Sequence, residues 1–262
     1  MLFLAIFKLN FIKSVQYRGS ILVKLIGTLI SVLVEISLWT ALFKANPIVK
    51  GTTFNDMINY MAITALLTLF AMAKSGDSLS HRITSGSIAT DLIRPYDLKL
   101  YLVAQNIGSN LFTFLIFTLP IYISVLIVYG IKLPPSPIII ILFFISVLLG
   151  SIISFYYSYI MGMIPFWLQS SWYIGWVDSA MFTLFAGTFV PLWFYPNILI
   201  KISFFLPFRY ITYEAVTFYL GKTSVTSMLN VFVMQIVWIV ILIIFEALLW
   251  RKAQKKIMIY GG

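Results

Sequence analysis

Long uncharged stretches dominate the chain and alternate with short polar ones. No Asp, Glu, Lys or Arg occurs between Lys99 and Lys132, and the next such stretch, between Lys132 and Asp178, holds 45 residues. That length is room for two membrane-crossing helices of about 20 residues each. Because the apolar runs are continuous rather than alternating, helices are favoured over the strands of a β-barrel.

Prolines, glycines and charged residues divide the chain into six candidate membrane spans. Pro134, Pro135 and Pro137 interrupt the chain before the fourth span, and Pro165 interrupts it before the fifth. The expected fold is an all-α polytopic membrane protein made of one transmembrane domain over residues 1–262. Its predicted spans cover residues 21–43, 55–74, 101–130, 138–163, 170–191 and 226–250.

The first 19 residues are expected to form an interfacial helix. Basic side chains such as Lys8 and Lys13 alternate there with Phe7, Phe11 and other apolar side chains. This pattern is typical of a helix that lies in the headgroup plane with its basic side chains reaching outward. The alternative is that residues 1–19 are the ordinary start of the first span.

Residues 192–222 resist assignment as a span. Pro196 and Pro207 cut an otherwise apolar stretch into pieces of about ten residues, each too short to cross the bilayer. A continuous helix would also bury Lys201 and Arg209, which is expensive at the bilayer centre. We expect short re-entrant helices in the outer leaflet; the alternative is a seventh span, which would place the C-terminus outside.

Composition supports a membrane location and sets an orientation. The chain is 61% hydrophobic and only 10% charged, whereas soluble domains carry about 25% charged residues. If both termini are cytoplasmic, twelve of the 18 Lys and Arg residues lie on the inner side, as the positive-inside rule requires. The net charge of +10 therefore indicates membrane topology and not nucleic-acid binding.

Few residues are suited to catalysis. The chain has no cysteine and a single histidine, His81, which excludes a Cys nucleophile and a Cys or His cluster for a metal. The sequence Leu220–Thr223 resembles the end of a phosphate-binding loop, but the first glycine of that motif would stand at Val216. We interpret it as a turn, and we expect no bound cofactor and no ATP hydrolysis by this chain.

Three carboxylates fall within or near predicted spans. Glu35 and Asp178 lie inside apolar stretches, and intramembrane carboxylates usually face a bundle interior or water. Both are candidates for a translocation route or a subunit interface. Glu246 is expected to pair with the basic edge at Arg251 and Lys252.

The predicted cytoplasmic loop 75–99 is the most informative polar stretch. Asp77 or Ser78 could cap a short amphipathic helix there and Gly86 could end it, with apolar side chains on one side and polar ones on the other. Such a helix either rests on the membrane or binds a soluble partner. The candidate contact residues are Asp77, Leu79, His81, Arg82, Ile83, Gly86, Ile88, Asp91, Leu92 and Arg94.

This loop resembles that of bacterial ABC-2 type transporter permeases, in particular the six-span ABC-2 family transporter proteins. Similar stretches follow at Phe185–Leu192, Leu206–Phe208 and Tyr219–Lys222, then at Gln235 and Trp238, and in a basic tail that ends at Gly261 and Gly262. The part of the loop that carries the resemblance reads Arg82-Ile83-x-x-Gly86-Ser87-Ile88-Ala89-x-Asp91-Leu92-Ile93-Arg94-Pro95.

The resemblance implies a permease that pairs with a second permease, of the same or a sister chain, in the bacterial inner membrane. Two cytoplasmic ATP-binding subunits would hold ATP and Mg. Residues 77–93 would be the coupling helix seated in a cleft of the ATPase, flanked by the interfacial segment. An amphipathic, peptide, drug or lipid-like substrate would move outward.

Other classes of protein stay open on the sequence alone. An ion-coupled secondary transporter could use Glu35 and Asp178 for coupling. An intramembrane enzyme is disfavoured by the lone His81 and by the lack of a clustered carboxylate pair. A scaffold or immunity protein that sequesters a toxic peptide would leave no recognisable motif.

Overall fold

A computed structural model describes residues 8–9, 11–12, 18–71, 73, 75–95, 97–130, 134–168, 172 and 174–260. The interfacial helix expected over residues 1–19 lies almost entirely outside the described residues. Helices make up most of the rest, which confirms the all-α expectation.

The helices of the first half are α2 (Arg18–Ala45), α3 (Phe54–Ala71), α4 (Ser75–Thr84), α5 (Ile88–Ile93), α6 (Leu98–Thr113) and α7 (Leu119–Tyr129). Those of the second half are α8 (Pro137–Met163), α9 (Pro165–Leu168), α10 (Ile174–Phe185), α11 (Asn197–Phe204), α12 (Tyr213–Tyr219) and α13 (Val225–Tyr260). Two 3-10 turns, η2 (Leu192–Phe194) and η3 (Phe208–Tyr210), flank α11.

Long helices occupy the first four and the sixth predicted spans. In the described part of the chain, two helical stretches are long and apolar enough to cross a membrane, Pro137–Leu168 and Val225–Lys256. Among the described residues of the fifth predicted span, the helix is α10, whose 12 residues have a length of about 18 Å at 1.5 Å per residue. The count of six crossings therefore stays a prediction.

The third predicted span is not one uniform helix. A π-helical segment, Phe114–Thr118, separates α6 from α7. Pro120 explains its position, because a proline ring clashes with the carbonyl four residues earlier, here that of Ile116, and supplies no N–H of its own. Widening the helix by one residue per turn over this segment relieves the clash.

A small hairpin was not foreseen from the sequence. Strands β1 (Ile48–Val49) and β2 (Thr52–Thr53) pair antiparallel, with Val49 opposite Thr52. Lys50 and Gly51 form the two-residue turn, with φ of 47° and 71°. Positive φ at both central residues is what a tight hairpin turn requires.

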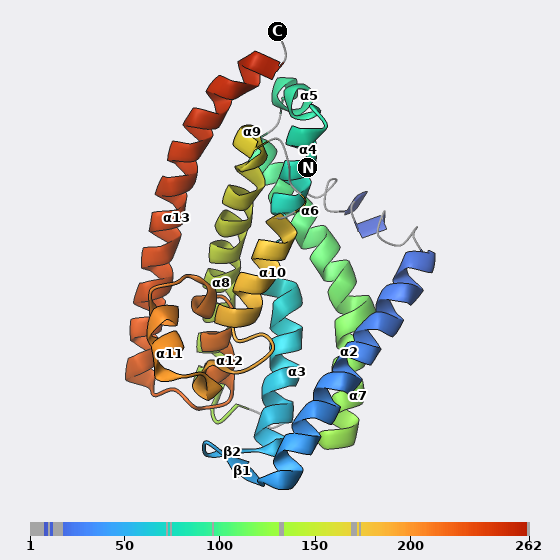
Figure 1. The fold of residues 1–262 in the computed structure, drawn as a ribbon, viewed down its shortest axis with the longest axis vertical. Coiled ribbons are helices and arrows are strands. Elements are labelled where there is room, and N and C mark those ends of the chain that lie inside the picture. Colours follow the sequence, from blue (N-terminus) through green and yellow to red (C-terminus); the bar gives the residue numbers. More distant parts are fainter. Residues whose placement is uncertain are drawn as a thin grey trace.

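Two ends of the molecule are distinct (Figure 1). The hairpin β1–β2 lies at one end of the bundle, and α4, α5 and the end of α13 lie together at the other. Helices α8 and α13 run side by side, and α8 also contacts α3, α4 and α12. The candidate coupling loop and the C-terminal end of α13 therefore lie at the same end of the bundle, as their assignment to one side of the membrane requires.

Residues 192–222 contain only short helices. The longest is α11, with eight residues, so this segment cannot form a seventh span as one helix. Within these short elements the side chain of Arg209 is buried, and Glu214 compensates its charge by an ion pair.

Candidate functional site

The candidate coupling loop is built on α8, the central helix of the bundle. Gly76 of α4 packs against Ser158 and Gly162 of α8, and a Cβ added to Gly162 would lie 2.6 Å from the Gly76 Cα. The Gly76 N–H donates to Ser158 Oγ at 3.0 Å. The serine of α8 thus satisfies an N–H of the first turn of α4, which no intrahelical carbonyl can reach.

A second set of contacts fixes the other face of α4. Leu79 is fully buried in the main hydrophobic cluster, which also includes Leu102 of α6 and Ile153 of α8. The Ser78 hydroxyl donates to Gln105 Oε1 of α6 at 3.2 Å. Helix α4 is therefore held between α6 and α8 and would transmit a displacement to both.

The loop holds two helices, which corrects the expectation of one helix over 77–93. Gly86, with φ of 75°, stands between α4 and α5 and reverses the chain. The ion pair between Arg82 and Asp91 joins α4 to α5 across Gly86. At the end of α5, Arg94 Nη1 lies 3.4 Å from the other Asp91 carboxylate oxygen. The prediction that Gly86 ends a helix is consistent with this geometry.

The single-helix pattern predicted that Asp91 lies on an exposed polar face, and this was wrong. Its side chain is buried, and Arg82 covers it while stacking 4.9 Å from the Tyr101 ring centroid. Burial lowers the pKa of Arg82, but the hydrogen bond and attraction to Asp91 outweigh burial and raise that pKa above its ordinary value. The pair, together with the Tyr101 ring, joins α4, α5 and α6.

The ten candidate residues of the loop divide by exposure. Leu79, Ile88 and Asp91 are buried, and Arg82 and Ile83 are half-buried, so these five hold the loop together. The residues available to a partner are Asp77, His81, Gly86, Leu92 and Arg94. Sequence reasoning missed Ile93, the last residue of α5, whose side chain is 84% exposed next to the exposed Leu92.

A second ion pair supports the same end of the molecule. Lys99 Nζ lies 2.8 Å from Glu246 Oε2, and its ammonium also sits 5.6 Å from the Tyr156 and Tyr159 ring centroids. The expectation that Glu246 pairs with Arg251 and Lys252 was wrong. Arg251 and Lys252 are five and six positions after Glu246 on α13, so they point to other faces of that helix. Lys99 reaches Glu246 instead from the start of α6.

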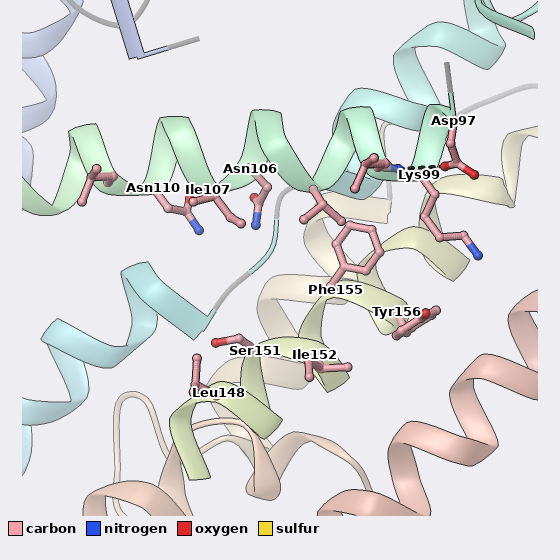
Figure 2. A pocket seen from close by; sticks show the side chains of 13 residues that line it. Asp97, Lys99, Asn106, Ile107, Asn110, Leu148, Ser151, Ile152, Phe155 and Tyr156 are labelled. Carbon is pink, nitrogen blue, oxygen red and sulfur yellow. Dashed lines mark hydrogen bonds between the residues drawn. The ribbon is translucent and has the colours of Figure 1, made fainter. Parts of the chain in front are cut away.

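A pocket of about 1040 Å³ lies between α6 and α8, next to Lys99 (Figure 2). Figure 2 shows the amides of Asn106 and Asn110 on α6 opposite Ser151 of α8, with Leu148 and Ile152 as apolar walls. At its polar end, Asp97 Oδ1 accepts a hydrogen bond from the Leu100 N–H at 2.8 Å. An apolar cavity with a few polar groups is suited to an amphipathic molecule.

The two intramembrane candidates lie on different helices. Glu35 is half-buried on α2, and Asp178 is half-buried on α10. The Asp178 carboxyl interacts with Tyr157 of α8, while its buried Oδ1 has no hydrogen-bond partner among the described residues. Both positions are compatible with a route or an interface, and their roles stay a prediction.

Sequence reasoning also missed a buried ion pair in the segment before α13. Arg209 Nη2 lies 2.6 Å from Glu214 Oε1, its Nη1 donates to Ser203 Oγ at 3.0 Å, and its guanidinium stacks 3.7 Å from the Phe204 ring centroid. The signal available was the spacing of opposite charges in an apolar stretch. A turn of 3-10 helix at Phe208–Tyr210 brings them together.

The comparisons with known proteins give one family. A family model described as ABC-2 family transporter protein matches residues 29–261, which includes the loop, both ion pairs near it and the segment before α13. No curated protein matches the chain.

Proposed function

The chain belongs to the ABC-2 family of transporter proteins, and from this premise we propose that it is the permease subunit of an ATP-binding cassette exporter. It moves an amphipathic, peptide, drug or lipid-like substrate outward across a bacterial inner membrane. Two copies of a cytoplasmic ATP-binding subunit hold ATP and Mg, and a second permease, identical or sister, completes the channel. Both termini face the cytoplasm.

The observation that carries this proposal is the compact α4–α5 unit at one end of the bundle. A loop transmits force only if it is rigid and anchored. Here Ser158 and Gly162 of α8 hold the start of α4, and the Arg82–Asp91 pair holds α5 to α4. Closure of an ATP-binding subunit pair against this unit would therefore push α8, rather than bend the loop.

The exposed part of the unit is suited to docking. Leu92 and Ile93 present apolar surface, and His81 and Arg94 stand as exposed polar neighbours. An apolar centre with a polar rim is the usual composition of a protein interface. The mechanism proposed is that ATP-driven closure displaces α4, and α8 carries the displacement toward the pocket that it forms with α6.

The test is isolation of the tagged full chain in mild detergent, followed by identification and quantification of the chains that co-purify. We expect a stoichiometric ATP-binding subunit whose ATPase activity changes when the complex is reconstituted. An ion-coupled secondary transporter, the alternative, would contain no such subunit and would transport on an ion gradient alone. Substrate uptake into inverted vesicles with ATP, or with an ion gradient and no ATP, separates the two.

A further inference from the structure

Small residues recur at every fourth position of α8 and form one stripe along that helix, the α8 stripe. Residues four apart in a helix lie on the same face, and small side chains let other backbone segments approach closely. All five members of the α8 stripe are buried: Ser146, Gly150, Ser154, Ser158 and Gly162. The stripe therefore offers one continuous surface on which segments from both ends of the bundle can pack.

One half of the α8 stripe holds the start of the coupling loop. The Ala73 N–H donates to Ser154 Oγ at 2.9 Å, and the Gly76 N–H donates to Ser158 Oγ at 3.0 Å. Gly162 lies against the Gly76 backbone, where an added Cβ would be 2.6 Å from the Cα. A displacement of α4 therefore reaches α8 through backbone contacts rather than through long side chains.

The other half of the α8 stripe holds the segment that begins at η3. A Cβ added to Gly150 would lie 2.5 Å from the Ile211 carbonyl oxygen. Gln235 of α13 is fully buried beside it. Its Nε2 donates to the carbonyl oxygen and the Oγ of Ser146, each at 3.0 Å, and to the Tyr210 carbonyl oxygen at 2.8 Å. This one amide thus joins α8, α13 and η3.

Residues 203–214, which run from the end of α11 into α12, are held together as a block. The buried Arg209 pairs with Glu214, and the Tyr210 hydroxyl donates to the Phe204 carbonyl oxygen at 3.1 Å. Figure 1 shows α11 and α12 nearer to the hairpin end of the bundle than α4 and α5 are. A displacement received at Tyr210 therefore moves the end of α11 as well.

We propose that Gln235 is a positioning residue for transport, which transmits a displacement of α8 to the 203–214 block. A buried donor that loses its acceptor is costly, so the block follows α8 instead of separating from it. The inference rests on the proposed function, because the ATP-binding subunit supplies the displacement at α4. The link from α8 to the block needs no such subunit, so the two proposals can fail separately.

The experiment follows the 203–214 block by fluorescence, in nanodiscs that hold the full chain with its ATP-binding subunit. Because the chain has no cysteine, Phe205→Cys accepts an environment-sensitive label at a position that is 80% exposed. We expect ATP to shift the emission, and the additional substitution Gln235→Leu to make this shift about threefold smaller. The ratio of substrate transported to ATP hydrolysed falls with it. Asn230→Leu, which removes an exposed amide from the same helix, changes neither quantity.

An undiminished shift in the Gln235→Leu variant overturns the inference, and so does an equal loss in Asn230→Leu. If no ATP-binding subunit is present, the proposed function fails, and Gly162→Ala then supplies the displacement, because its Cβ presses on α4. The emission change caused by Gly162→Ala must then disappear when Gln235→Leu is added; if it persists, the inference fails. If Gln235→Leu does not fold, Gln235→Asn decides, since it keeps an amide that is too short to bridge Ser146 and Tyr210.

Discussion

Arg82 and Asp91 form an ion pair that joins α4 to α5 across the chain reversal at Gly86. Asp91 is 3% exposed, so loss of this partner would leave a buried carboxylate less well compensated. The pair converts a polar loop into a folded unit, and α8 anchors that unit through close contact at Gly76. Coupling, in this account, is a property of the whole unit and not of one amphipathic helix.

Replacing Arg82 with Ala is expected to loosen the unit, because Asp91 then remains buried without its main partner. The cost is about 1–3 kcal/mol of local stability. Hydrogen exchange of residues 75–95 measures it, and ATPase-coupled transport is expected to fall with it. The control is Arg94→Ala, whose side chain is 57% exposed and contacts the same carboxylate at 3.4 Å. Equal effects of the two variants would contradict the assigned role of Arg82.

Gly86 is expected to tolerate Asn but not Val. Its φ of 75° is strained for any residue with a side chain, by about 1–2 kcal/mol, and least for Asn. No atom lies within 4 Å of a Cβ built there, so the strain of the backbone alone sets the difference. The measurement is the ratio of substrate transported to ATP hydrolysed. A Gly86→Val variant with the wild-type ratio would show that the reversal is not needed for coupling.

Packing between α4 and α8 is expected to be intolerant of added volume. A Cβ at Gly162 would meet the Gly76 backbone, and overpacking of this kind costs about 1–3 kcal/mol. The Gly162→Ala variant should therefore unfold at a lower temperature in detergent. Gly175→Ala is the matched control, because a Cβ at Gly175 meets nothing within 4 Å. A lower unfolding temperature in the control alone would refute the packing described.

Substitutions of Lys99 and Glu246 are expected to have non-additive effects on the free energy of unfolding. Lys99→Met leaves the carboxylate of Glu246 buried and unpaired, and is expected to destabilise the protein by about 1–3 kcal/mol. Lys99→Met/Glu246→Leu removes both charges and should recover most of that loss. Thermal unfolding of the two variants provides the comparison. A double variant less stable than the single one would mean that the pair does not act as a unit.

Much of the helical framework follows from local pattern. Continuous apolar runs bounded by prolines, glycines or charged residues locate α2, α3, α8 and α13, and Gly86 correctly marks a helix end. The π-helical segment before Pro120 is equally local in origin, because it depends on one proline ring. Such features depend on residues within a few positions of each other.

The ion pairs of the site do not follow from the local sequence pattern. Lys99 reaches Glu246 across 147 positions, and nothing in the sequence near either residue indicates the other. Arg82 and Asp91 are close in the sequence, but their pairing depends on a chain reversal that a single amphipathic pattern over 77–93 conceals. Helical periodicity assigns faces within one helix; it does not report which side chains meet between helices.

The most direct test of the account is site-directed cross-linking, which the chain favours because it contains no cysteine. Ile93→Cys introduces a thiol at the exposed end of α5, and Ile48→Cys introduces one at the exposed hairpin, at the other end of the bundle. In membranes that contain the whole complex, a thiol-to-amine reagent is expected to link Ile93→Cys to the ATP-binding subunit, in an amount that changes with ATP. Linkage from Ile48→Cys, or none from Ile93→Cys while the complex remains intact, would contradict the central claim that α4 and α5 receive the motor.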